Sequence, residues 1–492
     1  MHFDINILIL ISLSLFFMLF GIFYSKNFKS LSLYLNAGRS VKSWSLTSSI
    51  VASCFGVWIL IGPAEAATWG GLGAVIGYAL GQACPYLAFR IFGKRLRTLM
   101  PNGNSLTQFV YVRYGFLALR VILFITLFYI FIYLCAEVTA IAKIVNLITG
   151  LSLWKTSLLI LITTLIYTLR GGLRISILTD KFQFVIISFF LIFIFYFLFF
   201  SGNINISKEL IAFNTGPLIS SKYFYGYTAG ITFFIAVFAT NLFDQGMWQR
   251  VFSAQSDTDL DVGFRNAFFI ILPVILILGF CGIIGVSLGL SKTPSIIIFS
   301  LLLQNQAEVL SSIILILALT LVISSMDTLI NAISSLLIIE GKKFITLNSN
   351  ISYLNFSRIV LIILSIIIFY ISSQGLSVLY MFLLADLLCC AAAVPVFYGM
   401  FKNNISEKNT IIAIIFGLIF GLLLFPDITF QKSILVGVLF SSSLFPLWIS
   451  TALLFWSFVL AIFIPSIVIL LLKENKNRFD FNKVKRLVAD IN

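Results

Sequence analysis

An acidic residue stands inside a long apolar segment, residues 307–339, where residues 324–328 read Ser-Ser-Met-Asp-Thr. An ionised Asp in the middle of a bilayer costs roughly 2.5–3.5 kcal/mol even on the lenient insertion scale. Such an acid normally faces a partner, a cavity or an ion. Ser324 and Ser325, one turn before Asp327, supply neutral oxygen ligands. We therefore expect the chain to move a charged species, with Asp327 as the first marker of its site.

The composition is that of a membrane-embedded chain. Of the 492 residues, 60% are hydrophobic and only 10% are charged, and the mean hydropathy is +1.09. Apolar segments of about twenty residues, long enough to cross a hydrocarbon core, recur from end to end. We predict an all-α polytopic protein with about thirteen transmembrane helices, in segments 5–24, 44–65, 70–91, 117–146, 154–169, 180–201, 225–247, 266–290, 307–339, 357–373, 377–400, 409–425 and 449–472. Residues 432–448 fit either a further helix or a surface segment.

The net charge of +14 does not predict nucleic-acid binding, because of where the charges lie. Basic residues gather in short loops after alternate predicted spans, which is the positive-inside pattern. This pattern predicts an N-terminus outside and a C-terminus in the cytoplasm. We expect the protein in the plasma membrane, the inner membrane of a bacterium, with the lipid bilayer as a partner.

Several classes of function lack their sequence signals. No Walker motif occurs, so we do not expect ATP to be the energy source within this chain. The single histidine is His2, no His-Glu-x-x-His motif occurs, and the six cysteines lack metal-ligand spacing. We therefore predict one membrane transporter domain over residues 1–492, without enzymatic activity and with no cofactor other than a transported ion.

Two predicted spans are interrupted, 44–65 and 225–247, and five spans separate their starts. The responsible residues are Gly56, Gly62 and Pro63 in the first span and Gly226, Gly230, Gly246 and the polar run 241–245 in the second. Interrupted helices at corresponding positions of two halves indicate a midplane solute site in an inverted-repeat transporter. Glycines that ease close helix packing are the alternative.

Four segments in order resemble the sodium/solute symporter family. They are 35–40 (Leu-Asn-Ala-Gly-Arg-Ser) followed by 49–53; Gly171 to Arg174 with 178–183 (Leu-Thr-Asp-Lys-Phe-Gln); Asp244 and Gln245 with Gln249, Arg250 and Ala254; and 324–328. The resemblance covers roughly residues 20–425. It implies a leucine-transporter-like fold of two inverted five-helix repeats. The first repeat would be 44–201 and the second 225–401, with 1–43 and 402–492 as accessory parts.

The resemblance also implies a sodium site. Its ligands would be the hydroxyls of Ser324 and Ser325 and the backbone carbonyls of Ala52, Phe55 and Leu321. Oxygen ligands suit a small hard cation, and an interrupted helix leaves carbonyls unpaired. Alternatively, the two hydroxyls bond back to carbonyls one turn earlier in their own helix.

Two acids near this site have open roles. Asp327 would hold a second cation, pair with a base, or titrate. Asp180 would either be a charge at a helix start close to Arg174 or, as the resemblance implies, belong to the cytoplasmic ion path. For Arg250 we expect a structural role.

The solute contacts follow from the expected fold. Polar or aromatic side chains beside the interrupted helices are Trp58, Gln82, Thr240 and Asn241, and Asp386 adds an acid in the span 377–400. Polar bonds between helices are the alternative for each of them. Asp386 would suit a cationic or amine-bearing solute, or another ion.

These features predict a sodium-coupled secondary symporter that imports a small polar solute by alternating access. The expected solute is an amino acid, a urea-like compound or a carboxylate. A proton-coupled symporter of the same fold is the first alternative, and a polytopic membrane enzyme, a channel or a sensor is the second.

Overall fold

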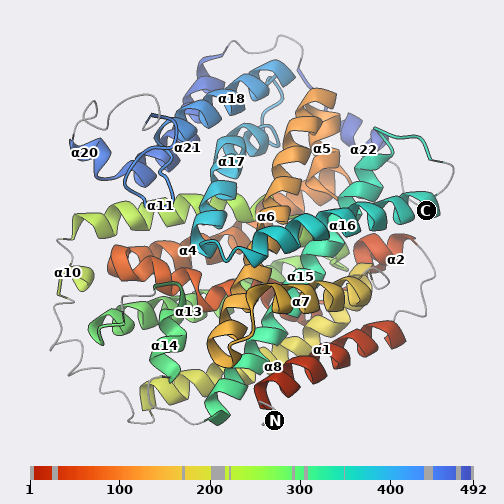
Figure 1. The fold of residues 1–492 in the computed structure, drawn as a ribbon. Coiled ribbons are helices and arrows are strands. Elements are labelled where there is room, and N and C mark those ends of the chain that lie inside the picture. Colours follow the sequence, from red (N-terminus) through yellow and green to blue (C-terminus); the bar gives the residue numbers. More distant parts are fainter. Residues whose placement is uncertain are drawn as a thin grey trace.

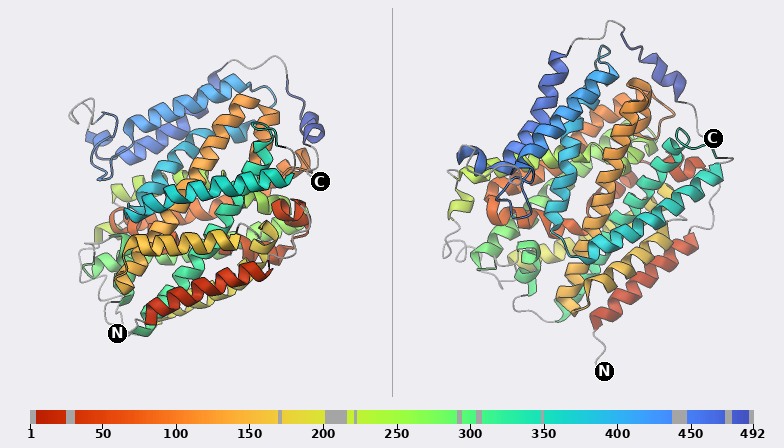
Figure 2. Two further views of the ribbon diagram at one scale, coloured as in Figure 1. Left: turned by 45° about the vertical axis from the view of Figure 1, so that its right-hand side comes forward. Right: turned by 45° about the horizontal axis from the view of Figure 1, so that its top comes forward.

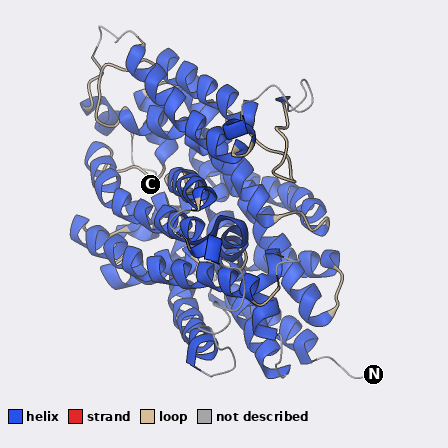
Figure 3. Ribbon diagram, turned by 90° about the vertical axis from the view of Figure 1, so that its left-hand side faces the viewer, coloured by secondary structure: helices blue, strands red, loops and turns tan. Residues whose placement is uncertain are grey.

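The computed structural model of the chain is built from helices (Figure 1), and the part that it describes contains no strand (Figure 3). It describes all residues except 1–4, 25–30, 169–171, 201–215, 221–222, 291–293, 304–307, 348–349, 437–446, 473–477 and 489–492. This architecture agrees with the all-α prediction. Helices suit a membrane because each helix forms its backbone hydrogen bonds internally, where lipid offers no partner. Gly171 of the predicted family motif and most of the open segment 432–448 lie outside the described residues.

Helices follow one another along the described chain, and the 3-10 helix η3 lies in the break between α3 and α4. Their bounds are α1 (Ile5–Tyr24), α2 (Leu31–Asn36), η2 (Ala37–Arg39), α3 (Ser43–Cys54), η3 (Val57–Leu60), α4 (Gly62–Leu99), α5 (Leu106–Arg113), α6 (Phe116–Thr149), α7 (Leu153–Thr168), α8 (Gly172–Phe200), α10 (Gly216–Ile219), α11 (Phe224–Asn241), α12 (Gln245–Ser253), α13 (Asp257–Ser287), η4 (Pro294–Ile296), α14 (Ile297–Leu303), α15 (Glu308–Gly341), α16 (Asn350–Ser373), α17 (Val378–Tyr398), α18 (Glu407–Leu424), α20 (Leu447–Ser450), α21 (Leu453–Leu471) and α22 (Asn482–Leu487).

Nine helices of the described part are long and apolar enough to cross a membrane, and the bent pair α11 and α12 makes up to ten. The shorter apolar helices Ile5–Leu19, Leu153–Ile166 and Pro294–Leu303 fall below that length. The chain is therefore a multi-span membrane protein. The count of about thirteen spans and the orientation of the termini stay predictions.

The first predicted interruption separates α3 from α4. Helix α3 ends at Cys54, Phe55 takes a non-helical conformation, and Gly56 is extended before the short helix η3. A further non-helical residue precedes Gly62, where α4 begins. The break thus lies at the glycine from which it was predicted.

One glycine inside α4 marks a kink near the start of the predicted span 70–91. Gly71 has φ +56°, in the left-handed region that favours glycine. A Cβ at this position would also lie 2.2 Å from the carbonyl oxygen of Leu218. The helix is therefore kinked here, at the second residue of the predicted span 70–91.

The second predicted interruption separates α11 from α12, whose axes differ by 54°. The carboxylate of Asp244 caps α12, because its Oδ1 accepts hydrogen bonds from the Gly246 and Met247 N–H groups at 2.7 and 3.4 Å. An Asp at this position satisfies N–H groups that have no partner within the helix. The predicted polar run 241–245 is where the helix bends.

Glycines let α4 and α11 approach closely. A Cβ on Gly73 would lie 2.0 Å from the carbonyl oxygen of Gly226, and one on Gly77 would lie 2.0 Å from that of Gly230. Small residues serve this purpose in membrane helices. For Gly226 and Gly230 the close-packing interpretation therefore holds. The helix is interrupted further along the chain, at residues 241–245.

The central helices bring distant segments together. Helix α15 packs against α3, α6 and α8, and α17 packs against α6 and α11. At the periphery, α18 and α21 pack on each other and on α17 at one side, while α1 packs on α7 and α15 at the opposite side (Figures 1 and 2). The site described next lies among the central helices.

Candidate cation and solute site

The two adjacent serines of α15 face the end of α3. The Ser324 hydroxyl donates a hydrogen bond to the Ala52 carbonyl at 3.0 Å. The Ser325 hydroxyl contacts the Leu321 carbonyl at 3.2 Å, one turn earlier in α15. Phe55 forms the C-cap of α3, three residues after Ala52. Ser324 and Ala52 are therefore neighbours across two packed helices, whereas no contact joins the Phe55 carbonyl to the serines in the described structure. The Ser325 contact is also the back-bond of the alternative interpretation.

Each of these hydroxyls also meets an acid. Ser324 Oγ lies 3.1 Å from Asp180 Oδ1 in α8, and Ser325 Oγ lies 2.9 Å from Glu137 Oε2 in α6. All four side chains are buried. A hydroxyl whose lone pairs face a cation needs an acceptor for its hydrogen. The two carboxyl groups provide such acceptors.

Glu137 also holds the break between α3 and η3. Its Oε2 accepts a hydrogen bond from the Val57 N–H at 2.9 Å, and its Oε1 accepts a long one from the Trp58 N–H at 3.4 Å. A Cβ on Gly56 would lie 2.1 Å from Oε1, so any larger residue here would displace the Glu137 carboxylate. The sequence reasoning missed Glu137. The signal was present, because it is an acid inside the predicted span 117–146.

Asp180 pairs with Arg250 and not with Arg174. Its Oδ2 lies 2.9 Å from Arg250 Nη2, and both side chains are fully buried. Arg250 Nε also donates to the hydroxyl of Ser49 at 2.9 Å. The expectation of a helix start at Asp180 was wrong, because α8 begins at Gly172 and continues through this position. The pairing agrees with the structural role expected of Arg250.

Asp327 keeps one carboxyl oxygen without a partner. Its Oδ1 accepts a hydrogen bond from Asn331 Nδ2 at 3.1 Å, whereas Oδ2 is buried and has no hydrogen bond within the described structure. The Oδ1 of Asn331 and the hydroxyls of Ser176 and Thr168 are likewise buried without a hydrogen bond of good geometry there, and both hydroxyls lie close enough to the Asp327 carboxyl to interact with it. Asp327 takes part in none of the ion pairs of the described residues. The described structure therefore does not support its pairing with a base.

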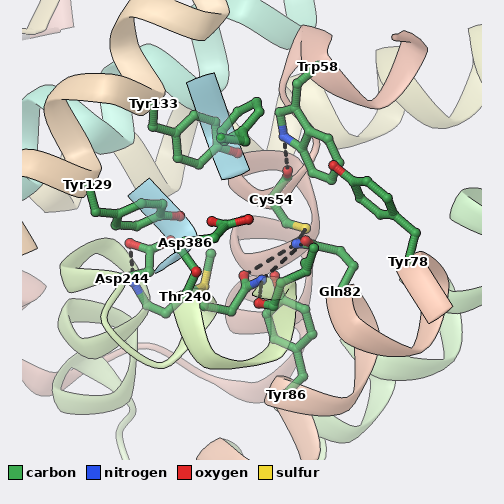
Figure 4. A pocket seen from close by; sticks show the side chains of 14 residues that line it. Cys54, Trp58, Tyr78, Gln82, Tyr86, Tyr129, Tyr133, Thr240, Asp244 and Asp386 are labelled. Carbon is green, nitrogen blue, oxygen red and sulfur yellow. Dashed lines mark hydrogen bonds between the residues drawn. The ribbon is translucent and has the colours of Figure 1, made fainter. Parts of the chain in front are cut away.

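A small polar cavity lies beside the break between α3 and η3 (Figure 4). The predicted solute contacts all line it, namely Trp58, Gln82, Thr240, Asn241 and Asp386. The remaining lining residues are Cys54, Tyr78, Tyr86, Tyr129, Tyr133, Val237, Asp244, Met247 and Phe382. Its free space of about 30 Å³ holds about two water molecules. A larger solute therefore requires these side chains to move apart.

Two amides join across the cavity wall. Gln82 Nε2 donates to Asn241 Oδ1 at 3.3 Å, and Asn241 Nδ2 donates to Gln82 Oε1 at 3.2 Å. This reciprocal pair connects α4 to α11 just before the bend. It is the interhelical polar contact named above as the alternative, and a solute would compete with it.

The cavity carries acids but no base among its lining residues. The carboxyl group of Asp386 lies at the centre of Figure 4, near Tyr129 and Tyr133, and its side chain is only 4% exposed. Asp244 already caps α12. A cavity with carboxyl groups and aromatic walls suits a protonated amine, since both attract a cation. It suits an anionic solute poorly.

Comparison with known proteins gives a consistent result. A sequence model described as the sodium:solute symporter family matches residues 34–417. The spermidine transporter DUR31 of Candida albicans is 28% identical over 399 residues, which cover 80% of this chain and 74% of that protein. The urea-proton symporter DUR3 of Oryza sativa subsp. japonica is 25% identical over 185 residues, which cover 38% of this chain and 26% of that protein.

A solved structure has the same fold. It is the substrate-bound, outward-open state of a Na⁺-coupled sialic acid symporter, with a TM-score of 0.72 and 18% identity. The alignment covers 96% of this chain and 98% of the other. This likeness supports the predicted leucine-transporter-like fold.

Proposed function

We propose that this chain, which belongs to the sodium:solute symporter family, imports a small amine-bearing solute together with sodium by alternating access. One observation carries the proposal. The Ser324 hydroxyl of α15 reaches the Ala52 carbonyl at the end of the broken helix, 272 residues away in the sequence. Two oxygens that a small cation prefers are thus brought together at a helix break, the usual place for such a site in an inverted-repeat transporter.

The proposed sodium ligands are those expected from the sequence, namely the Ser324 and Ser325 hydroxyls and the carbonyls of Ala52, Phe55 and Leu321. Sodium would replace the direct hydrogen bond between Ser324 and Ala52. The hydrogens of the two hydroxyls would then point to Asp180 and Glu137, which already contact them.

The proposed solute carries a protonated amine. Asp386 supplies the charge partner, and the surrounding tyrosines supply aromatic faces. The name of the Candida albicans relative, a spermidine transporter, supports this class. Among the solutes expected from the sequence, an amino acid fits through its amine, a urea-like compound fits through its N–H donors, and a carboxylate fits least.

We further propose a second cation position at Asp327. Its unpartnered Oδ2 and the unpartnered oxygens of Asn331, Ser176 and Thr168 come from α15, α8 and the end of α7. Buried oxygens without hydrogen bonds gain most from a cation. Asp180 is the weaker candidate because Arg250 already neutralises it.

The proposal includes the finer architecture. Two inverted repeats would occupy residues 44–201 and 225–401, with accessory parts at 1–43 and 402–492. The breaks between α3 and η3 and between α11 and α12 support this division, because they fall at corresponding places in the two halves. About thirteen spans, an external N-terminus and a cytoplasmic C-terminus in the plasma membrane complete it. Enzymatic activity forms no part of it, since the family and the solved neighbour are transporters.

Uptake into proteoliposomes tests the proposal. Labelled spermidine, an amino acid, urea and a monocarboxylate are offered with an inward sodium gradient or with choline in its place. We expect accumulation of the amine-bearing solute only with sodium, and its loss in Ser325→Ala. Ser466→Ala is the control, because this hydroxyl of α21 bonds back to Ile462 within its own helix. Sodium-independent uptake, or full activity of Ser325→Ala, would contradict sodium coupling.

Proton coupling is the second candidate, and the name of the rice relative, a urea-proton symporter, favours it. A pH gradient without sodium would then drive accumulation. The same proteoliposomes distinguish the two, because each gradient is imposed alone.

A further inference from the structure

Glu137 contacts both the proposed cation site and the wall of the solute cavity. Its Oε2 accepts hydrogen bonds from Ser325 Oγ and from the Val57 N–H, each at 2.9 Å. Its Oε1 accepts the longer bond from the Trp58 N–H. The side chain is fully buried and comes from α6, a third helix that belongs to neither partner.

On the cation side, Ser325 has competing acceptors for its single hydrogen. The hydroxyl contacts Glu137 at 2.9 Å and the carbonyls of Leu321 and Val322 at 3.2 Å each. A cation bound to Ser325 and to the Leu321 carbonyl removes one of these acceptors. Of the two acceptors that remain, the Glu137 carboxylate at 2.9 Å is closer than the Val322 carbonyl at 3.2 Å, and a hydrogen bond to an ionised acceptor is the stronger one, so the hydrogen turns to Glu137.

On the solute side, Glu137 fixes the backbone that carries Trp58. The Trp58 ring stacks on Tyr78 with centroids 5.9 Å apart, and its edge meets Phe382 at 6.0 Å. All three aromatic side chains line the cavity. Because η3 is a single turn, a shift of the Val57 and Trp58 N–H groups also moves the Trp58 ring, and with it this wall of the cavity.

We propose that Glu137 couples cation binding at Ser325 to the solute cavity by holding the N–H groups of Val57 and Trp58. Without a cation, the carboxylate divides its hydrogen bonds among three donors. With a cation, it moves toward Ser325, and η3 follows because both N–H groups are bonded to the same carboxylate. Glu137 is thus a positioning residue, and its role rests on the proposed sodium site.

Amide hydrogen exchange of the full-length protein tests this without a solute. The probe is sodium itself, compared with choline. We expect sodium to slow exchange at Val57 and Trp58 in the wild type. Glu137→Gln keeps the size of the side chain but turns its NH₂ group toward donors, so the sodium-dependent protection should fall about tenfold or more. Binding of labelled sodium is measured on the same samples.

Glu407→Gln is the matched control. Glu407 also accepts two backbone N–H groups at the start of a helix, those of Leu117 and Ala118, at 2.9 and 3.0 Å. It holds the first turn of α6 and lies far along that helix from Glu137. This variant should keep the sodium-dependent protection of Val57 and Trp58.

A second measurement separates coupling from a merely structural role. Spermidine affinity is measured with and without sodium, and the ratio of the two dissociation constants is the coupling factor. A structural defect would weaken binding equally in both conditions, whereas loss of coupling brings the ratio in Glu137→Gln close to one. If Glu137→Gln does not fold, Ser325→Ala serves instead. It should remove the sodium-dependent protection of the Val57 and Trp58 N–H groups while leaving the residues of the cavity wall unchanged.

The outcomes are distinct. Unchanged sodium-dependent protection in Glu137→Gln overturns the role of Glu137, and if that variant does not fold, unchanged protection in Ser325→Ala does so. The sodium site still stands in either case if labelled sodium binds the wild type. Absence of sodium binding to the wild type overturns the proposed function and this inference with it. Protection and coupling that both disappear in Glu137→Gln, with control values retained in Glu407→Gln, support the inference.

Discussion

Four acids lie inside the helices around the break between α3 and η3, and each has different partners. Glu137 accepts bonds from backbone N–H groups, and Asp180 is neutralised by Arg250. Asp327 has an amide neighbour, and Asp386 faces a cavity. A buried charge is tolerated when it is paired and hydrogen-bonded. Asp327 and Asp386 have neither backbone N–H donors, as Glu137 has, nor a base, as Asp180 has, and are therefore the ones we expect to meet transported cations.

Asp327→Asn should remove one cation from the transport cycle. The substitution keeps the shape of the side chain but removes the charge that would hold a cation beside Asn331, Ser176 and Thr168. We expect binding of labelled sodium to the purified protein to fall from two ions to one, while Ser325→Ala removes the other. Two ions bound to Asp327→Asn would contradict the second position.

Asp386→Asn should weaken binding of an amine-bearing solute. Removing the charged partner of a buried ammonium costs about 3–5 kcal/mol, or more than a hundredfold in affinity. Sodium binding should stay nearly unchanged, because Asp386 lies on α17 and the proposed sodium ligands do not. Scintillation proximity binding of labelled spermidine measures the effect.

Asp427→Asn is the matched control for Asp386→Asn. This acid lies in the loop after α18, where the hydrogen bond from the Thr429 hydroxyl lowers its pKa, so it is ionised at neutral pH. Its replacement removes the same charge from a residue that does not line the cavity and should leave spermidine affinity unchanged. An equal loss in both variants would indicate a general effect of charge and not a contact with the solute.

Asp327 and Asp386 were predictable because each is a costly acid in an apolar span. Glu137 gives the same signal in 117–146, but no motif accompanies it, and it was overlooked. The ion pair of Asp180 with Arg250 was not predictable from spacing. It depends on the tertiary fold, which brings Asp180 of α8 and Arg250 of α12 together although they are 70 residues apart in the chain.

At the scale of helices, the proposed cation site lies at the break after α3, and the glycines set how closely α4 and α11 pack. The interruption at Gly56 and the bend at residues 241–245 follow from local sequence, because glycine and polar residues end helices. The partner of each glycine does not follow from it. Gly73 and Gly77 are needed because the backbone of α11 lies directly against them, and this pairing of helices is a property of the tertiary fold.

Gly77→Ala should destabilise the contact between α4 and α11. The new methyl group would lie 2.0 Å from the Gly230 carbonyl oxygen, which is backbone and cannot rotate away. Overpacking of this kind costs about 1–3 kcal/mol or more. We expect a lower midpoint of thermal unfolding in detergent.

Gly341→Ala is the matched control for Gly77→Ala. Its new Cβ would meet only Tyr353, at an ordinary distance of 3.8 Å, at the end of α15. A helical Gly→Ala change without a clash tends to stabilise. An unfolding midpoint for Gly77→Ala equal to or above that of Gly341→Ala would show that the two helices separate more easily than their packing indicates.

At the scale of the whole molecule, the proposed cation site and the proposed solute cavity share helices from distant parts of the chain. Helix α15 supplies the serines, α3 the carbonyl of Ala52, and α6 both Glu137 and two cavity tyrosines. The sequence indicated the order of these segments through its resemblance to a family. Their contacts, and the small free volume of the cavity, required the folded structure.

A symporter that carries sodium and an amine-bearing solute moves net positive charge inward. An inside-negative potential contributes about 2.3 kcal/mol per charge per 100 mV, which raises the limiting accumulation about fiftyfold for each charge. In proteoliposomes with potassium and valinomycin, the potential is set to zero or to about −100 mV while the sodium gradient is held constant. We expect accumulation of spermidine at zero potential, driven by sodium alone, and a much higher level at the negative potential. Omitting sodium at the negative potential is the control, because a leak of cationic solute would persist without sodium and coupled transport would not.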